Sequence, residues 1–158
     1  ASDFAAAEGL LAQGATELRR MGETAYLSTH LAYLGDALYR LGRYDEADRA
    51  ALESERLTQA GDVASEAGWR SVRARVLARR GEHDQAARLA REAIDWVETT
   101  DSVPMIADQY EAFANVLRLA GRDAEAVAAL EQALELYERK GHRPFAERTR
   151  AQLAELRA

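Results

Sequence analysis

Cysteine is absent from the 158-residue chain. Its absence excludes disulfides, thiolate zinc sites and catalysis by a thiol. Long apolar runs are absent too, and none approaches the ~18 residues of a membrane-spanning helix. No signal-peptide pattern opens the chain. We therefore expect a cytoplasmic domain without a membrane partner, and a first residue that is Ala rather than Met leads us to expect a piece of a longer protein.

Signals for catalysis and for nucleotide or metal binding are also missing. The chain has no Gly-x-x-x-x-Gly-Lys-Ser/Thr loop, no Gly-x-Gly-x-x-Gly and no His-Glu-x-x-His. Its three histidines, His30, His83 and His142, are far apart in sequence. We therefore predict no enzyme activity, no cofactor and no metal site. The net charge of −6 argues against nucleic acid as a partner, because such binding depends on neutralising phosphates.

The residues that are abundant favour helices. Hydrophobic residues make up 47% of the chain, largely as Ala and Leu, and there are only two prolines, Pro104 and Pro144. Periodic apolar faces and glycine stops predict eight helices joined by short links, so that neighbours are antiparallel. The expected ranges are about 3–21, 24–41, 45–60, 63–80, 84–99, 104–120, 123–140 and 144 to the end.

Four related phrases recur along the chain: FAAAEG, GRYDEA, GEHDQA and GRDAEA. Their shared alanines, Ala7, Ala47, Ala86 and Ala126, are 40, 39 and 40 residues apart. A period in this range is typical of stacked repeats. We predict a single all-α domain, a right-handed superhelix of about eight antiparallel helices. Its expected units are 1–22 (partial), 24–61, 62–100, 102–141 and 143–158 (partial).

The repeat resembles the tetratricopeptide repeat. The first unit has Leu34-Gly35 in one helix and then Gly42-x-Tyr44-x-x-Ala47 at the turn. Small residues at matching places, Gly35, Ala74 and Ala114, are expected to face Ala47, Ala86 and Ala126 and to let the two helices of a hairpin approach closely. The period is longer than the roughly 34 residues usual for that family. The resemblance implies a non-catalytic module that binds other proteins.

A second resemblance covers most of residues 25–156. The stretches AYLSTHLAYLGDALYRLGRYDEA, GWRSVRARVLARRGE and LYERKG are similar to the C-terminal repeat tails of bacterial class III adenylate/guanylate cyclase–ATPase regulators. Long repeats of this sort also resemble those of maltose-regulator-type activators. The resemblance implies a regulatory module of a signalling or transcription regulator, with other domains of the parent protein among its partners.

The resemblance also places a groove along the first helix of each hairpin. The residues expected to line it are Asp36, Tyr39, Arg40, Ser71, Arg75, Arg79, Glu111, Asn115 and Arg118. Four of them are arginines, which would form an exposed basic stripe. Guanidinium groups bind carboxylates in a bidentate manner, so we expect a protein or acidic peptide as the partner. The alternative is a small-molecule effector bound in the same groove.

Two further features leave alternatives open. Five arginines occur in residues 67–81 without an acid among them: Arg70, Arg73, Arg75, Arg79 and Arg80. They either pair with acids on adjacent helices or form a basic strip for a partner. If the chain is cut from a longer array, its terminal helices lack a neighbour on one side, and we expect exposed apolar faces and self-association there. The alternative is that the terminal helices serve as caps. The expected carriers are Leu11, Leu18, Leu153 and Leu156.

Overall fold

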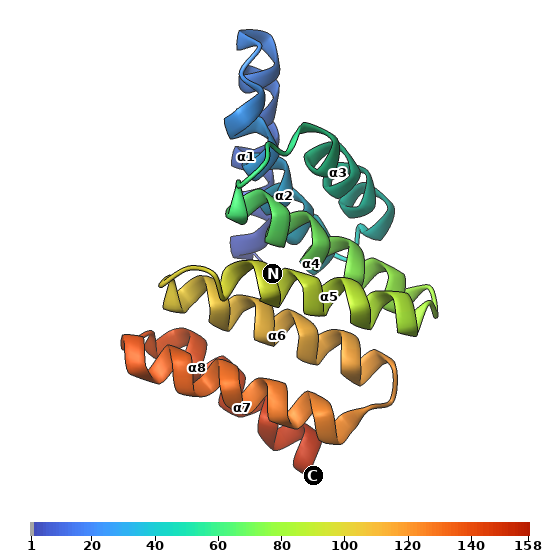
Figure 1. Ribbon diagram of the computed structural model, residues 1–158, viewed down its shortest axis with the longest axis vertical. Helices are drawn as coiled ribbons and strands as arrows, with labels where there is room; N and C mark the ends of the chain where they lie inside the picture. Colours follow the sequence, from blue (N-terminus) through green and yellow to red (C-terminus); the bar gives the residue numbers. More distant parts are fainter. Residues whose placement is uncertain (1) are drawn as a thin grey trace.

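The computed structural model describes residues 2–158, with side chains from Phe4 onward; Ala1 lies outside the described residues. This part of the chain contains eight helices and no strand (Figure 1). The helices are α1 (Ser2–Met21), α2 (Thr24–Arg40), α3 (Tyr44–Leu57), α4 (Val63–Arg79), α5 (His83–Val97), α6 (Val103–Leu119), α7 (Asp123–Lys140) and α8 (Arg143–Arg157). The prediction of an all-α chain of eight helices is confirmed. None of these helices has the length and apolar character needed to cross a membrane.

The helix starts follow the expected signals. The Asp62 side chain caps α4 by accepting a hydrogen bond from the backbone N–H of Ser65 at 3.2 Å. Pro104 and Pro144 lie in the first turns of α6 and α8, where a missing N–H leaves no backbone bond unmade. The end of α3 was predicted too late, because Thr58 takes an extended conformation and its hydroxyl donates to the Ser54 carbonyl at 2.7 Å.

The glycines of the repeated phrases close the hairpins. Gly81 has a φ of +87°, a left-handed conformation that other residues adopt at a cost. The chain reverses there, and the backbone N–H of Glu82 donates to the Leu77 carbonyl at 3.0 Å. Gly42 and Gly121 occupy the same place in their turns, so the recurring glycine of the sequence marks the recurring turn.

The hairpins stack into a solenoid. We call α2, α4, α6 and α8 the first helices and α1, α3, α5 and α7 the second helices. Figure 1 shows α1 and α2 along the long axis at the top, α4 to α6 lying across it below, and α7 and α8 at the bottom. Each first helix from α2 to α6 packs on the second helix that follows it, and α2 and α4 also pack on the next first helix.

The close contacts within hairpins are where the alternating small residues predict them. A Cβ placed on Gly35 would lie 3.3 Å from the Ala47 carbonyl oxygen and 3.2 Å from Val72, so α2 lies close to both α3 and α4. The corresponding alanines of the next two hairpins are buried in one apolar cluster: Ala74, Ala86, Ala114 and Ala126. Trp69 packs in the cluster between α2 and α4, and Trp96 packs against the start of α6.

The two ends of the solenoid differ from the sequence prediction. Leu153 is buried on the side of α8 that faces α6 and α7, so its predicted exposure is wrong. Leu11, Leu18 and Leu156 are partly buried at the edges of apolar clusters. The exposed large apolar side chains near the N-terminal end are instead Leu10, Met21, Tyr26 and Tyr33.

Candidate binding site on the face of the first helices

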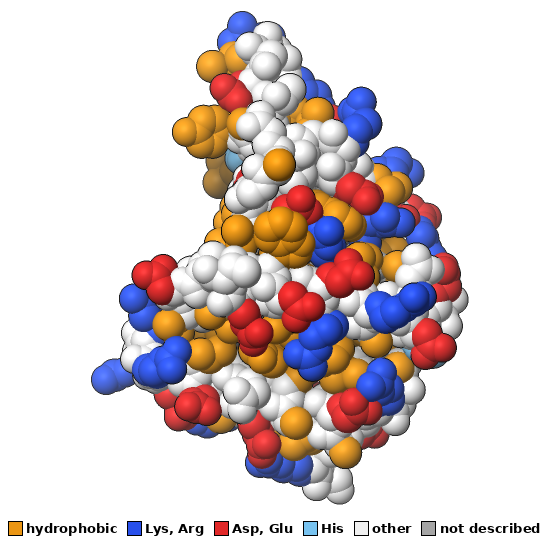
Figure 2. Space-filling model, viewed as in Figure 1, with side chains coloured by type: hydrophobic (Ala, Val, Ile, Leu, Met, Phe, Trp, Pro, Cys, Tyr) orange, Lys and Arg blue, Asp and Glu red, His pale blue; other side chains and the backbone are white. Residues whose placement is uncertain are grey.

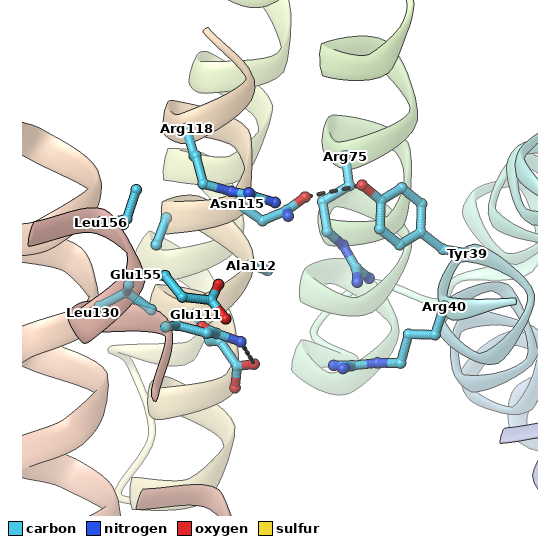
Figure 3. A pocket seen from close by; sticks show the side chains of 12 residues that line it. Tyr39, Arg40, Arg75, Glu111, Ala112, Asn115, Arg118, Leu130, Glu155 and Leu156 are labelled. Atoms are coloured by element: carbon cyan, nitrogen blue, oxygen red, sulfur yellow. Dashed lines mark hydrogen bonds between the residues drawn. The ribbon is translucent and has the colours of Figure 1, made fainter. Parts of the chain in front are cut away.

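A cavity of about 340 Å³ opens on the face formed by the first helices. Figure 3 shows side chains from α2 and α4 on one side of it and from α6 and α8 on the other. Leu130 of α7 contributes to the floor between α6 and α8. The full lining comprises Tyr39, Arg40, Arg75, Glu111, Ala112, Ala114, Asn115, Arg118, Leu130, Gln152, Glu155 and Leu156. We call this space the groove cavity.

Six of the nine residues expected in the groove line this cavity: Tyr39, Arg40, Arg75, Glu111, Asn115 and Arg118. Asp36 lies directly behind them, since its carboxylate accepts hydrogen bonds from Arg40 and Arg75. Arg79 lies beside Tyr39 and lines a separate hollow at the α2–α3 turn. Ser71 is 6% exposed and lies outside the lining, with its carbonyl accepting from Arg75 Nε at 3.1 Å.

Arg75 is a buried ion-pair partner and not part of an exposed stripe. The residue is 5% exposed, its Nη2 lies 2.7 Å from Asp36 Oδ1, and its guanidinium lies 4.5 Å from the centre of the Tyr39 ring. A guanidinium held by a carboxylate and an aromatic face is satisfied within the protein. The prediction that Arg75 belongs to an exposed stripe of four arginines is therefore wrong. Arg75 joins α4 to α2 through its ion pair with Asp36.

Tyr39 connects three first helices through its hydroxyl group. The hydroxyl donates to Asn115 Oδ1 of α6 at 2.9 Å (Figure 3) and accepts from Arg79 Nε of α4 at 3.2 Å. The Tyr39 ring also packs on the Tyr44 ring, with centroids 5.2 Å apart. This one side chain therefore sets the spacing between α2, α4 and α6 along one edge of the groove cavity.

Glu111 performs the same task for α8. Its Oε2 accepts from Arg148 Nη2 at 2.6 Å and from the Tyr137 hydroxyl at 3.1 Å. Its Oε1 accepts from Gln152 Nε2 at 3.3 Å. The Glu111 side chain is buried. A buried charge is costly unless it is paired and hydrogen-bonded, and these three contacts supply both the ion pair and the hydrogen bonds. Glu111 therefore holds α8 against α6 and α7 and fixes the far wall of the cavity.

The pKa values of two aspartates near the cavity, Asp36 and Asp108, are shifted in opposite directions. Burial alone would raise the pKa of Asp36, but the adjacent Arg75 and Arg40 guanidiniums outweigh it and hold that pKa below its usual value. Partial burial raises the pKa of Asp108, and the negative charge of Glu111 adds to the rise despite the bond from the Tyr137 hydroxyl. The face of the first helices thus carries both signs of charge at close quarters.

Two guanidinium groups are turned toward the open space. Arg40 uses its Nε for Asp36 at 2.9 Å, and its outer nitrogens point across the cavity toward Glu111 in Figure 3. Arg118 is exposed, and it makes no side-chain hydrogen bond or ion pair with the side chains that the structure describes, those from Phe4 onward. Leu130 and Leu156 supply an apolar patch, and Glu155 adds an acid at the edge. The arrangement offers guanidinium N–H donors for a bound carboxylate beside an apolar surface.

The remaining three arginines of residues 67–81 pair with acids on neighbouring helices, and one of them also pairs with an acid of α4 itself. Arg70 pairs with Glu66 and Glu92, and Arg73 pairs with Glu55 at 3.1 Å. Arg80, which follows the helix, lies 2.7 Å from Asp48. The alternative of a solvated helix whose arginines meet acids nearby is therefore correct for these three, and they play no part in the cavity.

Sequence reasoning missed the contribution of α8 and of the cavity floor. Gln152, Glu155 and Leu156 come from α8, which was expected only to end the chain. The signal was present, because α8 continues the alternation of first and second helices. Gln152 and Glu155 are three residues apart, like Asn115 and Arg118 of α6, a spacing that puts both members of each pair on one face of a helix.

Comparison with known proteins agrees with this architecture. Residues 106–140, which form most of α6 and all of α7, match the family model of the tetratricopeptide repeat. The chain as a whole is a tetratricopeptide-like solenoid. No curated protein matches the chain.

Many solved structures are similar to the chain, among them two that cover nearly all of it. The crystal structure of BtubC (BKLC) from P. vanneervenii superposes with a TM-score of 0.69 at 17% identity, covering 97% of this chain. This chain spans 65% of the BtubC chain. The MamA RS-1 ArsTM double mutant matches with a TM-score of 0.46 at 15% identity, covering 96% of this chain and 94% of the other. At such identities the BtubC likeness establishes the fold alone.

Proposed function

We propose that this chain is a non-catalytic protein-interaction module, and that its groove cavity binds a partner segment through an acidic side chain. The observation that supports the proposal is the pair of guanidinium groups, Arg40 from α2 and Arg118 from α6, that line the cavity from opposite sides. Tetratricopeptide repeats generally bind other proteins, and the cavity lies on the face of the first helices.

The pattern of charges around the cavity indicates which chemical class of ligand fits. Arg75 is already neutralised by Asp36, and Glu111 by Arg148. Arg40 shares the Asp36 carboxylate with Arg75 through its Nε at 2.9 Å. The charged groups at the cavity that keep free hydrogen-bonding capacity among the described side chains are therefore the outer nitrogens of Arg40, the Arg118 guanidinium and the Glu155 carboxylate. A bound carboxylate is therefore favoured between the two arginines and disfavoured beside Glu155. An apolar residue next to the acid would cover Leu130 and Leu156, which adds burial of apolar surface.

The test is a binding measurement on single substitutions. A fluorescent library of ten-residue peptides is screened against the chain, and the best acidic binder is titrated by anisotropy at fixed salt. Arg118→Ala and Arg40→Ala should each weaken it by about 1.5 kcal/mol, roughly tenfold, because each removes a charge-assisted contact. Arg122→Ala is the matched control, since Arg122 is exposed in the α6–α7 turn and pairs locally with Glu125.

Two outcomes of this binding measurement would refute the carboxylate site. If acidic peptides bind no better than their amide counterparts, or if all three arginine variants bind equally, the carboxylate site is refuted. Circular dichroism of each variant separates this outcome from loss of the fold.

A small-molecule effector is the second candidate, and the cavity volume favours it. About 340 Å³ falls at the lower end of the ~300–1,000 Å³ typical of small-ligand pockets. A thermal-shift screen with amino acids and dicarboxylates tests it. A stabilisation that Arg118→Ala abolishes, in the absence of any peptide that binds, would favour the effector over the peptide.

We further propose that the module belongs to a bacterial signalling or transcription regulator and acts in the cytoplasm. The support is the resemblance of residues 25–156 to the repeat tails of cyclase–ATPase regulators. In that setting the partner segment would come from another domain of the same regulator. Sequencing the complete reading frame around this chain tests the assignment, and a frame without a cyclase, ATPase or DNA-binding domain contradicts it.

A further inference from the structure

Each of the four first helices carries an arginine in its last turn: Arg40 in α2, Arg79 in α4, Arg118 in α6 and Arg157 in α8. Because consecutive helices are antiparallel, the first helices all run in the same direction, and these arginines follow one edge of their common face. A cation in the last turn of a helix interacts favourably with the helix dipole. The dipole accounts for the residue type at the four positions, but it leaves the outer nitrogens of each guanidinium free to bind an acid.

Two of these arginines already have an acidic partner within the chain. Arg40 Nε lies 2.9 Å from Asp36 Oδ2, and Arg157 pairs with Glu131 of α7. Figure 2 shows a similar mixture on the face that it presents, where blue basic side chains lie beside red acidic ones over much of the surface. A guanidinium that is paired in this way has fewer N–H donors left for a ligand.

The other two, Arg79 and Arg118, are exposed and have no acidic partner among the side chains that the structure describes, those from residue 4 onward. They belong to adjacent first helices, since α4 packs directly on α6. Each of these helices also has a first helix on its other side. α4 packs on α2, and α6 is bonded to α8 through Glu111 and Arg148. The two free charges therefore lie in the middle of the solenoid and not at one of its ends.

Two hydrogen-bonded side chains, Tyr39 and Asn115, link the positions of these arginines. Arg79 Nε donates to the Tyr39 hydroxyl at 3.2 Å, and that hydroxyl donates to Asn115 Oδ1 at 2.9 Å. Arg118 follows Asn115 by three residues, a spacing that puts both on one face of α6 (Figure 3). Arg118 lines the groove cavity, whereas Arg79 lines the hollow of about 360 Å³ at the α2–α3 turn.

The Arg79 side chain is held in place without losing its charge. Its guanidinium lies 4.8 Å from the centre of the Tyr44 ring, and its Nε is bonded to a neutral hydroxyl group. The acids that line the hollow, Asp45 and Glu46, are occupied by other arginines. A guanidinium that is positioned by an aromatic ring and keeps its outer N–H donors is well suited to bind a carboxylate.

We propose that Arg79 is a second carboxylate-binding residue, so that the partner segment carries two acidic side chains, one bound at Arg118 in the groove cavity and one at Arg79 beyond Tyr39. This inference rests on the proposed function, because it keeps the partner in the groove cavity and adds a second contact. The axes of packed helices lie about 8–10 Å apart, and an extended chain advances about 3.3–3.6 Å per residue. The two acids should therefore be three positions apart in the partner segment.

The test compares peptides that carry one or two acids. Fluorescein-labelled ten-residue peptides of Gly and Ser contain Leu-Glu and then a second Glu, placed either three positions after the first or next to it. A third peptide has Gln in place of the second Glu, and each peptide is also made in reversed order. They are titrated into the full chain by anisotropy at fixed salt. In one of the two directions, we expect acids three positions apart to bind at least threefold more tightly than either alternative.

Substitutions in the protein identify the residue that binds the second acid. Arg79→Gln should weaken the two-acid peptide at least threefold and leave the one-acid peptide unchanged, whereas Arg118→Gln should weaken both. Arg157→Gln is the matched control, because Arg157 has the same place in α8 but is paired with Glu131, and it should change neither affinity. Circular dichroism and the unchanged affinity of the one-acid peptide show that Arg79→Gln keeps its fold and its groove cavity.

Three results would overturn the inference. The first is that the one-acid and two-acid peptides bind the unaltered chain equally well. The second is a loss in Arg79→Gln that is the same for both peptides, because Arg79 would then shape the cavity through Tyr39 and bind no acid. The third is that no peptide of the series binds.

The proposed function is judged separately from this inference. Binding that depends on Arg118 but not on Arg79 contradicts the second carboxylate site and leaves the proposed function standing. Acidic peptides whose binding is independent of Arg118 contradict the proposed function itself.

Discussion

Two glycines within helices, Gly9 and Gly68, have different surroundings. Gly9 of α1 has nothing within 4 Å of the place a Cβ would take. Gly68 of α4 has Ala32 Cβ only 2.7 Å from that place. Replacing a helical glycine by alanine removes backbone freedom from the unfolded chain, while a forced contact between two packed helices adds strain.

This contrast gives a paired prediction. Gly9→Ala should stabilise the protein by about 0.5–1 kcal/mol, as expected for an unhindered helix position. Gly68→Ala should destabilise it by about 1 kcal/mol or more, because overpacking at about 1–3 kcal/mol outweighs the gain in helix propensity. Urea unfolding of both variants measures the difference. Equal stabilisation by the two substitutions would show that α2 and α4 are further apart than described.

Replacing two aspartates near the groove cavity by asparagine should change the stability of the protein in opposite directions. The pKa of Asp36 is lowered in the folded state, so its contribution is present above the unfolded pKa of about 3.9 and disappears as the pH falls through the folded value. The pKa of Asp108 is raised, so ionising it costs stability as the pH rises from the unfolded value through the folded one. In Asp108→Asn, the amide oxygen keeps an acceptor for the Tyr137 hydroxyl.

At pH 7, Asp36→Asn should therefore destabilise by about 1–2 kcal/mol, a range reduced for partial solvent exposure. Asp108→Asn should stabilise by a few tenths of a kcal/mol. Below the unfolded pKa of about 3.9 the effect of Asp108→Asn should vanish, whereas the effect of Asp36→Asn should begin to shrink there and disappear only below the lowered folded pKa of Asp36. Urea unfolding at pH 7 and pH 3 measures them, and a stability loss in Asp108→Asn at pH 7 would contradict the direction given for its pKa.

At the residue scale the sequence predicted positions better than it predicted roles. The repeat register placed Arg75 on the face of the first helices, and the side chain lies there. It did not reveal that Asp36, 39 residues earlier, occupies the equivalent position on α2 and neutralises Arg75. Charge pairing across helices depends on rotamers and on how closely the helices approach, and neither is encoded in the spacing of one helix.

At the scale of helices, each hairpin depends on small residues at its crossing. Ala86 of α5 is fully buried in the cluster that contains Ala74 of α4. Ala86→Leu should cost roughly 1–3 kcal/mol through overpacking. Gln85→Leu is the control, because Gln85 is its exposed neighbour and the added apolar surface points to solvent. Chemical denaturation compares the two, and an unchanged midpoint for Ala86→Leu would refute the packing of this hairpin.

The starts, ends and order of the helices were predictable because they depend on local chemistry. Asp62, Pro104 and Gly81 each act within a turn of their own position. The role of α8 was not predictable in this way. Its place beside the groove cavity depends on Glu111, which receives hydrogen bonds from two residues of α8 that lie 37 and 41 positions away. Only the superhelix as a whole brings these groups together.

At the scale of the molecule, side chains on the first helices keep the hairpins at a fixed spacing. The bond from Tyr39 to Asn115 joins residues 76 positions apart and links the first complete hairpin to the third. Arg75 with Asp36 joins α4 to α2, and Glu111 with Arg148 joins α6 to α8. These polar contacts bound the cavity and also join successive first helices, so we expect occupancy of the cavity and the curvature of the solenoid to be coupled.

Tyr39→Phe tests, in the absence of a ligand, whether the Tyr39 hydroxyl holds α2 and α6 at their observed spacing. Loss of the hydroxyl removes the bond to Asn115 and the acceptor for Arg79, which should cost about 1 kcal/mol and let α2 and α6 move apart. Spin labels at positions 43 and 122, in the α2–α3 and α6–α7 turns, should give a longer and broader distance distribution by pulsed electron resonance. Tyr44→Phe is the matched control: Tyr44 packs on the same ring, and its hydroxyl makes no hydrogen bond within residues 2–158. A distribution that is identical in both variants and in the unaltered chain would show that apolar packing alone sets the curvature.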